Sequence, residues 1–145
     1  MAQQAQANAL ENLGKHLGAA QMRLASAEQL FASGDRTYAC VNLFGVAADL
    51  HALGESETAL ILGTWLVRLT GATMDEERRT GVYSHIDDFL ELLHQLSPEE
   101  LARIEPQAAA MTDADALALA RDRIHHQELL AGIGEGDASE RPYKA

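Results

Sequence analysis

The most specific chemical pattern in this sequence is a glutamate followed three residues later by a histidine, Glu91 and His94. This spacing places a carboxylate and an imidazole on one side of a helix, as in helical bundles that carry two metal ions. His125 and Glu128 form a second pair in the opposite order. At 100° per residue, however, Glu91 and His94 fall opposite the apolar stripe of their predicted helix. We therefore expect an exposed polar face, and a metal-binding enzyme built on the two pairs is the second alternative.

Other catalytic arrangements are weaker. His51 lies in the apolar middle of the sequence, but no nucleophile or orienting acid is placed beside it, so we predict a hydrogen-bonded core histidine rather than a general base. The chain carries neither a glycine-rich phosphate-binding motif nor a nucleophile elbow. The adjacent acids Glu99 and Glu100 point about 100° apart in a helix, so they do not converge for acid–base catalysis. We expect a protein that is not an enzyme and holds no cofactor.

The charge of the chain is strongly negative and unevenly distributed. Its 145 residues carry a net charge of −11 at neutral pH. Residues 1–72 hold six acids and four bases, a net −2, whereas residues 73–145 hold sixteen and seven, a net −9. Such a field repels phosphate backbones and anionic lipid, so we expect no nucleic acid and no membrane as a partner, and favour a basic protein. The acidic side chains predicted to meet that partner are Asp87, Asp88, Glu91, Glu99 and Glu100.

Hydrophobic periodicity predicts an all-α fold. Apolar residues recur in steps of three and four from Leu10 to Phe31, which predicts a long N-terminal helix over about residues 3–33. Thr73 and Ser97 begin capping boxes, Pro106 is expected to interrupt a helix, and three glycines from Gly132 on are expected to end the last one. We predict an antiparallel bundle of about five helices in a single domain, residues 1–131, with a flexible tail, 132–145. Five more helices are predicted after the first one. They span residues 36–53, the segment from the turn at Gly54 to about residue 70, and residues 74–96, 98–105 and 112–131.

One sequence device occurs twice. LFASGDRTYA, residues 30–39, returns twenty residues later as LHALGESETA. Gly34 and Gly54 supply the left-handed residue that ends a helix; Asp35 can cap the next helix after the first turn, and Glu55 or Ser56 after the second. Over residues 27–66 the pattern resembles the hairpin of tetratricopeptide repeats. Because that family repeats after 34 residues, the resemblance implies three consecutive antiparallel helices rather than a repeat solenoid.

The middle of the chain is poor in charge. From Thr37 to Val67 the only acids or bases, histidine aside, are Asp49, Glu55 and Glu57. A helix that is apolar around most of its circumference must be covered on several sides. Either these helices form the centre of the bundle, or a second copy of the chain covers them. The residues predicted to serve self-association or to hold a small apolar ligand are Phe44, His51 and Trp65.

These features favour a non-enzymatic acidic interaction protein, of the adaptor, chaperone, immunity or inhibitor type. It would self-associate as a homodimer through its low-charge helices and bind a basic protein. The alternative is a helical bundle that binds a small apolar ligand. A single cysteine, Cys40, and the absence of a long apolar segment predict a cytoplasmic protein.

Overall fold

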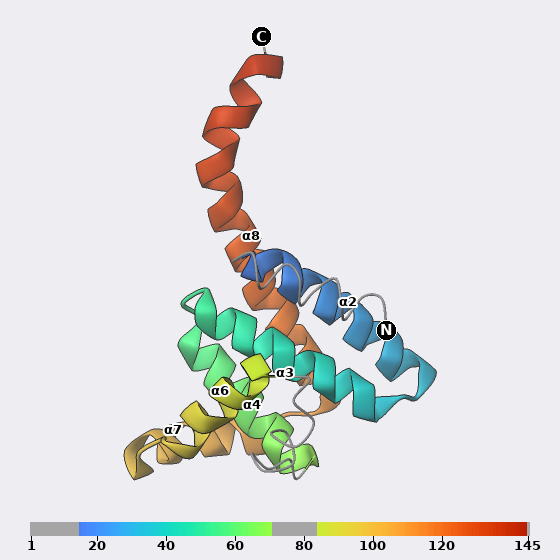
Figure 1. Cartoon of the computed structure of the whole chain (residues 1–145), viewed down its shortest axis with the longest axis vertical. Coiled ribbons are helices and arrows are strands. Elements are labelled where there is room, and N and C mark those ends of the chain that lie inside the picture. Colours follow the sequence, from blue (N-terminus) through green and yellow to red (C-terminus); the bar gives the residue numbers. More distant parts are fainter. Residues whose placement is uncertain (1–14, 71–83, 145) are drawn as a thin grey trace.

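The computed structural model of the chain describes residues 15–70 and 84–144, with side chains described for 15–69 and 88–132. Within these ranges the chain is helical and contains no strand, which confirms the predicted all-α class. None of the described helices is long and apolar enough to cross a membrane. The helices are α2 (His16–Ser33), α3 (Arg36–Ala52), α4 (Ser56–Thr70), α6 (Ser84–His94), α7 (Pro98–Ala109) and α8 (Asp113–Lys144) (Figure 1).

Helix α3 lies at the centre of the molecule. It packs against α2, α4, α6 and α8 (Figure 1). Leu43, Val46 and Leu50 on α3 are completely buried. On α4, Trp65 is also buried, and its indole N–H donates a hydrogen bond of 3.2 Å to the carbonyl of Met111. The low-charge helices are therefore covered on several sides, as their composition requires, and the cover comes from the chain's own helices.

Two glycine turns separate the first three described helices. Gly34 and Gly54 have φ of +88° and +92°, and they are the glycines with positive φ in the described ranges. After each glycine the next backbone N–H donates across the turn over 2.8 Å, from Asp35 to Leu30 and from Glu55 to Leu50. The repeated segment is thus one helix end used twice, because glycine reaches this conformation without steric cost. The further likeness to tetratricopeptide hairpins remains a prediction.

The predicted N-terminal helix begins later than expected. Lys15 has φ −100° and ψ 64°, which is not a helical conformation, so α2 starts at His16. The prediction of one continuous helix through residue 15 is therefore wrong. The earlier part of the prediction, residues 3–14, lies outside the described residues. Ala20, Leu24 and Ala27 of the apolar stripe are buried, as predicted. Periodicity identifies the buried face of a helix, but it continues across a break and does not locate the first residue.

Two predicted helix ends are also wrong. Pro106 lies inside α7, which continues to Ala109. A proline in a helix interior costs about 3 kcal/mol, and here burial of Ile104 and Ala108 on either side favours the helical path. Helix α8 likewise runs past Gly132 to Lys144 and includes all three glycines, although each lowers helix propensity by about 1 kcal/mol. Its last part extends beyond the other helices (Figure 1); the flexibility predicted for residues 132–145 remains a prediction.

The predicted helix starts at Ser97 and Thr112 are confirmed, and the helix predicted at 74–96 is confirmed in its second half. Ser97 caps α7 with a reciprocal capping box to Glu100, and Thr112 and Asp115 exchange similar bonds at the start of α8. Helix α6 corresponds to the second half of the helix predicted at 74–96. Residues 71–83, which include Thr73, lie outside the described residues.

Candidate functional site

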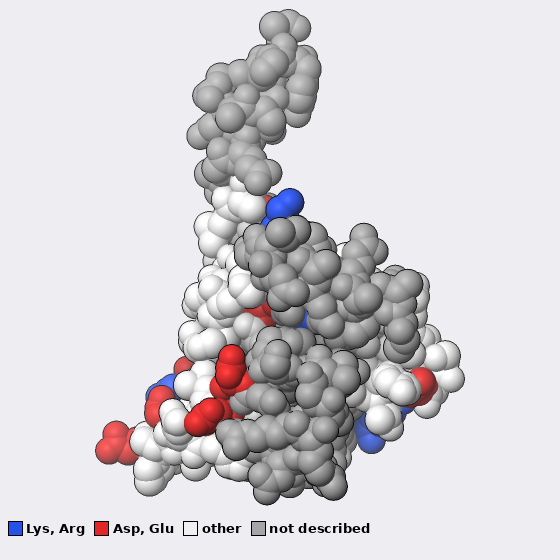
Figure 2. Space-filling model, in the orientation of Figure 1, with Lys and Arg blue, Asp and Glu red and all other residues white. Residues whose placement is uncertain are grey.

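The acidic residues predicted from the sequence lie on α6 and at the start of α7. Asp88, Glu91 and Glu99 are exposed, and Glu100 is half-buried. Figure 2 shows acidic side chains over α6 and the neighbouring part of α7. The side chain of Asp87 is outside the described set. We refer to Asp88, Glu91, Glu99 and Glu100 as the acidic surface.

The capping box fixes one charge of this surface. The Glu100 carboxylate accepts a hydrogen bond of 3.0 Å from the backbone N–H of Ser97, whose hydroxyl accepts one of 3.2 Å from the Glu100 N–H. The hydrogen bond from the Ser97 backbone N–H, and after it the Ser97 side chain, lower the pKa of the Glu100 carboxyl group below its ordinary value because they favour the ionised form. Glu100 therefore remains charged throughout the neutral range.

The described arginine side chains are engaged in ion pairs within the protein. Each of the six arginines whose side chain is described forms an ion pair with an acid from another part of the chain. Asp88 and Glu99, by contrast, form no ion pair with any described side chain, so negative charge is left unbalanced on the acidic surface. The pairs are Arg23–Asp49, Arg36–Asp113, Arg68–Glu105, Arg103–Glu57, Arg121–Glu28 and Arg123–Glu55.

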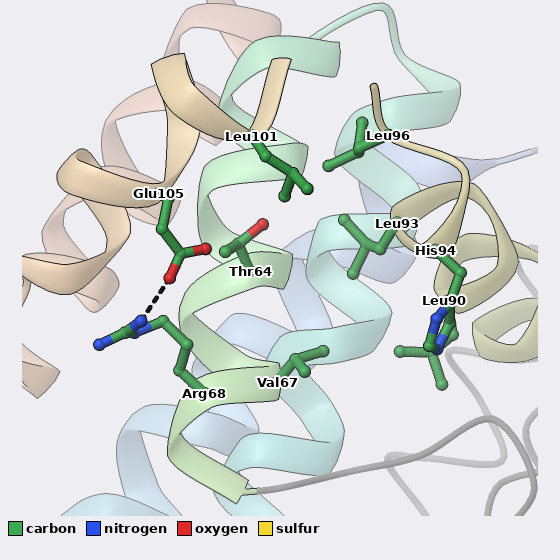
Figure 3. A pocket seen from close by; sticks show the side chains of 9 residues that line it. All are labelled: Thr64, Val67, Arg68, Leu90, Leu93, His94, Leu96, Leu101 and Glu105. Carbon is green, nitrogen blue, oxygen red and sulfur yellow. Dashed lines mark hydrogen bonds and ion pairs between the residues drawn. The ribbon is translucent and has the colours of Figure 1, made fainter. Parts of the chain in front are cut away.

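A cavity of about 180 Å³ lies between α4 and the two helices that carry this surface, α6 and α7 (Figure 3). Most of its lining is aliphatic, with the ion pair of Arg68 and Glu105 at one side. Because the lining combines α4 with α6 and α7, which follow α4 only after residues 71–83, no local pattern predicted the cavity. The lining residues are Thr64, Val67 and Arg68 of α4, Leu90, Leu93 and His94 of α6, Leu96, and Leu101 and Glu105 of α7.

The two predicted metal pairs do not form one centre. Glu91 and His94 are exposed on α6, as their spacing indicated. On α8, His125 Nδ1 lies 3.4 Å from Glu128 Oε1, and Glu128 also accepts a hydrogen bond from Gln21. Among the side chains described, no group of three or more histidine, cysteine, aspartate or glutamate residues is placed to hold a metal ion.

The predicted set of Phe44, His51 and Trp65 is divided between the core and the surface. Phe44 and Trp65 are 3% and 5% exposed, so the chain itself covers them. His51 is exposed in the last turn of α3, which corrects the expectation of a core histidine: the turn at Gly54 brings this helix end to the surface. Its Nδ1 lies 3.1 Å from Ser56 Oγ, a contact that the sequence did not reveal.

The His51–Ser56 contact meets one requirement of a catalytic pair in which a histidine activates a hydroxyl nucleophile, namely hydrogen-bond distance between the two groups. Such a pair also needs a group that orients the histidine. In the described part of the chain, the His51 ring makes no hydrogen bond besides the one to Ser56, and it packs near Phe89 with centroids 6.2 Å apart. The contact therefore links the end of α3 to the start of α4.

A buried charge pair between α2 and α3 was also missed. Arg23 Nη1 lies 3.2 Å from Asp49 Oδ2, and His16 Nδ1 lies 3.0 Å from Asp49 Oδ1. A methyl group on Gly45 would lie 2.5 Å from Arg23 Cδ, so the glycine leaves space for the arginine. The only available signal was a single acid, Asp49, inside an otherwise uncharged stretch.

Comparison of the chain with models of known protein families finds no match, and neither do comparisons with curated proteins and with solved structures.

Proposed function

We propose that this chain is a non-enzymatic binding protein whose acidic surface on α6 and α7 docks a basic segment of another protein. One observation carries the proposal. The described arginines are paired with acids between elements, whereas Asp88 and Glu99 have no ion-pair partner among the described side chains. A cationic segment is the partner chemistry that this charge favours.

The exposure of these carboxylates determines what kind of binding to expect. Exposed charges accelerate encounter and select partners more than they add affinity. Each exposed charge pair stabilises a complex by about 0.2–1 kcal/mol, and salt screens the interaction. Binding should therefore weaken strongly between about 0.1 and 0.5 M salt.

Calorimetric titration with a short peptide of lysine and alanine residues tests the proposal. Neutralising the surface with the double substitution Asp88→Asn and Glu99→Gln should weaken binding roughly two- to tenfold at low salt. Asp88→Asn alone is then compared with Asp122→Asn, because each removes one exposed carboxylate and Asp122, which is 74% exposed, lies on α8. Equal weakening by these two single variants would mean that only the overall charge of the protein matters, and would contradict the proposal.

Self-association and an apolar ligand remain separate predictions. Burial of Phe44 and Trp65 by the chain's own helices removes the argument that a second copy must cover them. Sedimentation at micromolar concentration tests for a dimer without assuming its interface.

A further inference from the structure

We infer that the cavity between α4, α6 and α7 seats one phenyl-sized side chain of the basic segment that docks on the acidic surface. The inference rests on the proposed function. It names the feature that a partner must carry besides positive charge.

The size and lining of the cavity support this occupant. Its volume is about 180 Å³. In another protein, a cavity of about 150 Å³ lined by leucine, isoleucine and phenylalanine stays dry and binds benzene. A phenyl ring therefore fits within this pocket, which unlike that cavity is open to solvent at its mouth. Five of the nine lining residues are leucine or valine, which suits an aromatic hydrocarbon.

The cavity is buried at its floor and open at its mouth. Leu90 and Thr64 are 1% and 8% exposed, whereas Leu101 is 39% exposed. Figure 3 shows the leucine side chains of α6 and α7 facing Thr64 and Val67 across the opening. A side chain that entered would displace water from apolar walls and cover Leu101. Anchors of this kind contribute much of the free energy of protein interfaces.

The negative charge on α6 and α7 favours basic residues on either side of the inserted aromatic residue in the partner segment. Helices α6 and α7 supply both the cavity walls and the acidic surface. At the cavity itself Glu105 is already paired with Arg68, so the charges available to a partner lie on Asp88 and Glu99. An aromatic residue flanked by lysine or arginine satisfies both features at once.

The test compares two peptides that differ in one residue. Both consist of lysine and alanine, and one carries a single central phenylalanine where the other has alanine. Calorimetry should give about tenfold or tighter binding for the phenylalanine peptide, because burying this side chain contributes more than its neighbours' exposed charges. The protein is the same in both titrations, so its folding does not affect the comparison.

Two protein variants locate the effect. Leu101→Trp places a bulky ring at the cavity mouth and should abolish the preference for phenylalanine. Leu129→Trp is the matched control, because Leu129 is 54% exposed on α8 and does not line the cavity. It should leave the preference intact.

The possible results distinguish a failure of the cavity assignment from a failure of the proposed acidic docking surface. Equal affinity for both peptides, or a preference that survives Leu101→Trp, would overturn the assignment of the cavity and leave the acidic surface standing. Binding of free benzene at the cavity without any preference between peptides would point to a small-ligand site and also overturn it. Failure of both peptides to bind at low salt would overturn the proposed function itself.

Discussion

Arg23 on α2 and Asp49 on α3 form an ion pair whose two side chains have no exposed surface, with 3.2 Å between Nη1 and Oδ2. Removing two charges from water costs several kcal/mol each, and the pair recovers this only through close geometry. Asp49 also contacts His16, and Gly45 leaves the space that Arg23 occupies. The α2–α3 contact is therefore specific to one alignment of the two helices.

Breaking this pair from one side should strongly destabilise the protein. Asp49→Ala leaves the Arg23 guanidinium buried without its carboxylate, and should lower the free energy of unfolding by about 3–5 kcal/mol. Replacing both residues together, with Arg23→Met and Asp49→Leu, should recover most of the loss. Urea unfolding measures both changes. If Asp49→Ala alone cost less than about 1 kcal/mol, the burial of this pair would be contradicted.

Two glycine-to-alanine substitutions in helices should have opposite signs. A methyl group on Gly63 would lie 2.5 Å from Phe89 Cε2, in the contact between α4 and α6, so Gly63→Ala should destabilise by about 1–3 kcal/mol. Nothing lies within 4 Å of a methyl group on Gly132, so Gly132→Ala should be neutral or stabilise α8 by up to about 1 kcal/mol. Thermal unfolding compares them; equal effects would contradict the packing of Phe89 on α4.

Cys40 should be unreactive in the folded protein. Its side chain is 3% exposed, and burial raises the pKa of the thiol above its ordinary value. At pH 8 the thiolate fraction is therefore smaller than that of a free cysteine, and only the thiolate reacts. Labelling with an aromatic disulfide reagent should be slow in buffer and fast in urea. Equally fast labelling in both would show that this part of α3 is open.

The same shift makes stability depend on alkaline pH. Because the Cys40 pKa is raised in the folded state, the unfolded chain releases this proton first as the pH rises. The contribution of the Cys40 thiol to the free energy of unfolding is fully present below the ordinary thiol pKa, and it is lost as the pH rises from that value through the raised pKa of the folded protein.

The capping box at α7 gives a prediction at acid pH. Ser97→Ala removes the hydroxyl that accepts from the Glu100 N–H and loosens the box, so the pKa of Glu100 should rise toward its ordinary value. Since the folded pKa of Glu100 is lowered, its contribution is present at neutral pH and lost as the pH falls through that pKa. A carbon-detected NMR titration of the side-chain carboxyl measures the change. An unchanged Glu100 pKa would mean that the box does not persist in solution.

Local features of this fold could be predicted from the sequence, and tertiary ones could not. The turns at Gly34 and Gly54 and the cap at Ser97 depend on a few neighbouring residues, and each was predicted correctly. Pro106 was misjudged because the helix around it is supported by packing of Ile104 and Ala108, which propensity does not include.

The site shows the same division. Exposure of Glu91 and Glu99 follows from helical spacing and from position at a helix start. The Arg23–Asp49 pair and the cavity depend on which helices meet, so residue types alone do not reveal them. Even His51, in an apolar stretch, is exposed because its helix ends there.

The most direct test of the acidic surface is a map of backbone amide NMR shifts during titration with the lysine peptide. The proposal predicts that the largest shifts fall on α6 and α7, over residues 88–105, and that they disappear at about 0.5 M salt, where exposed charges are screened. Largest shifts on α2 or α8, or shifts spread evenly over the molecule, would contradict it.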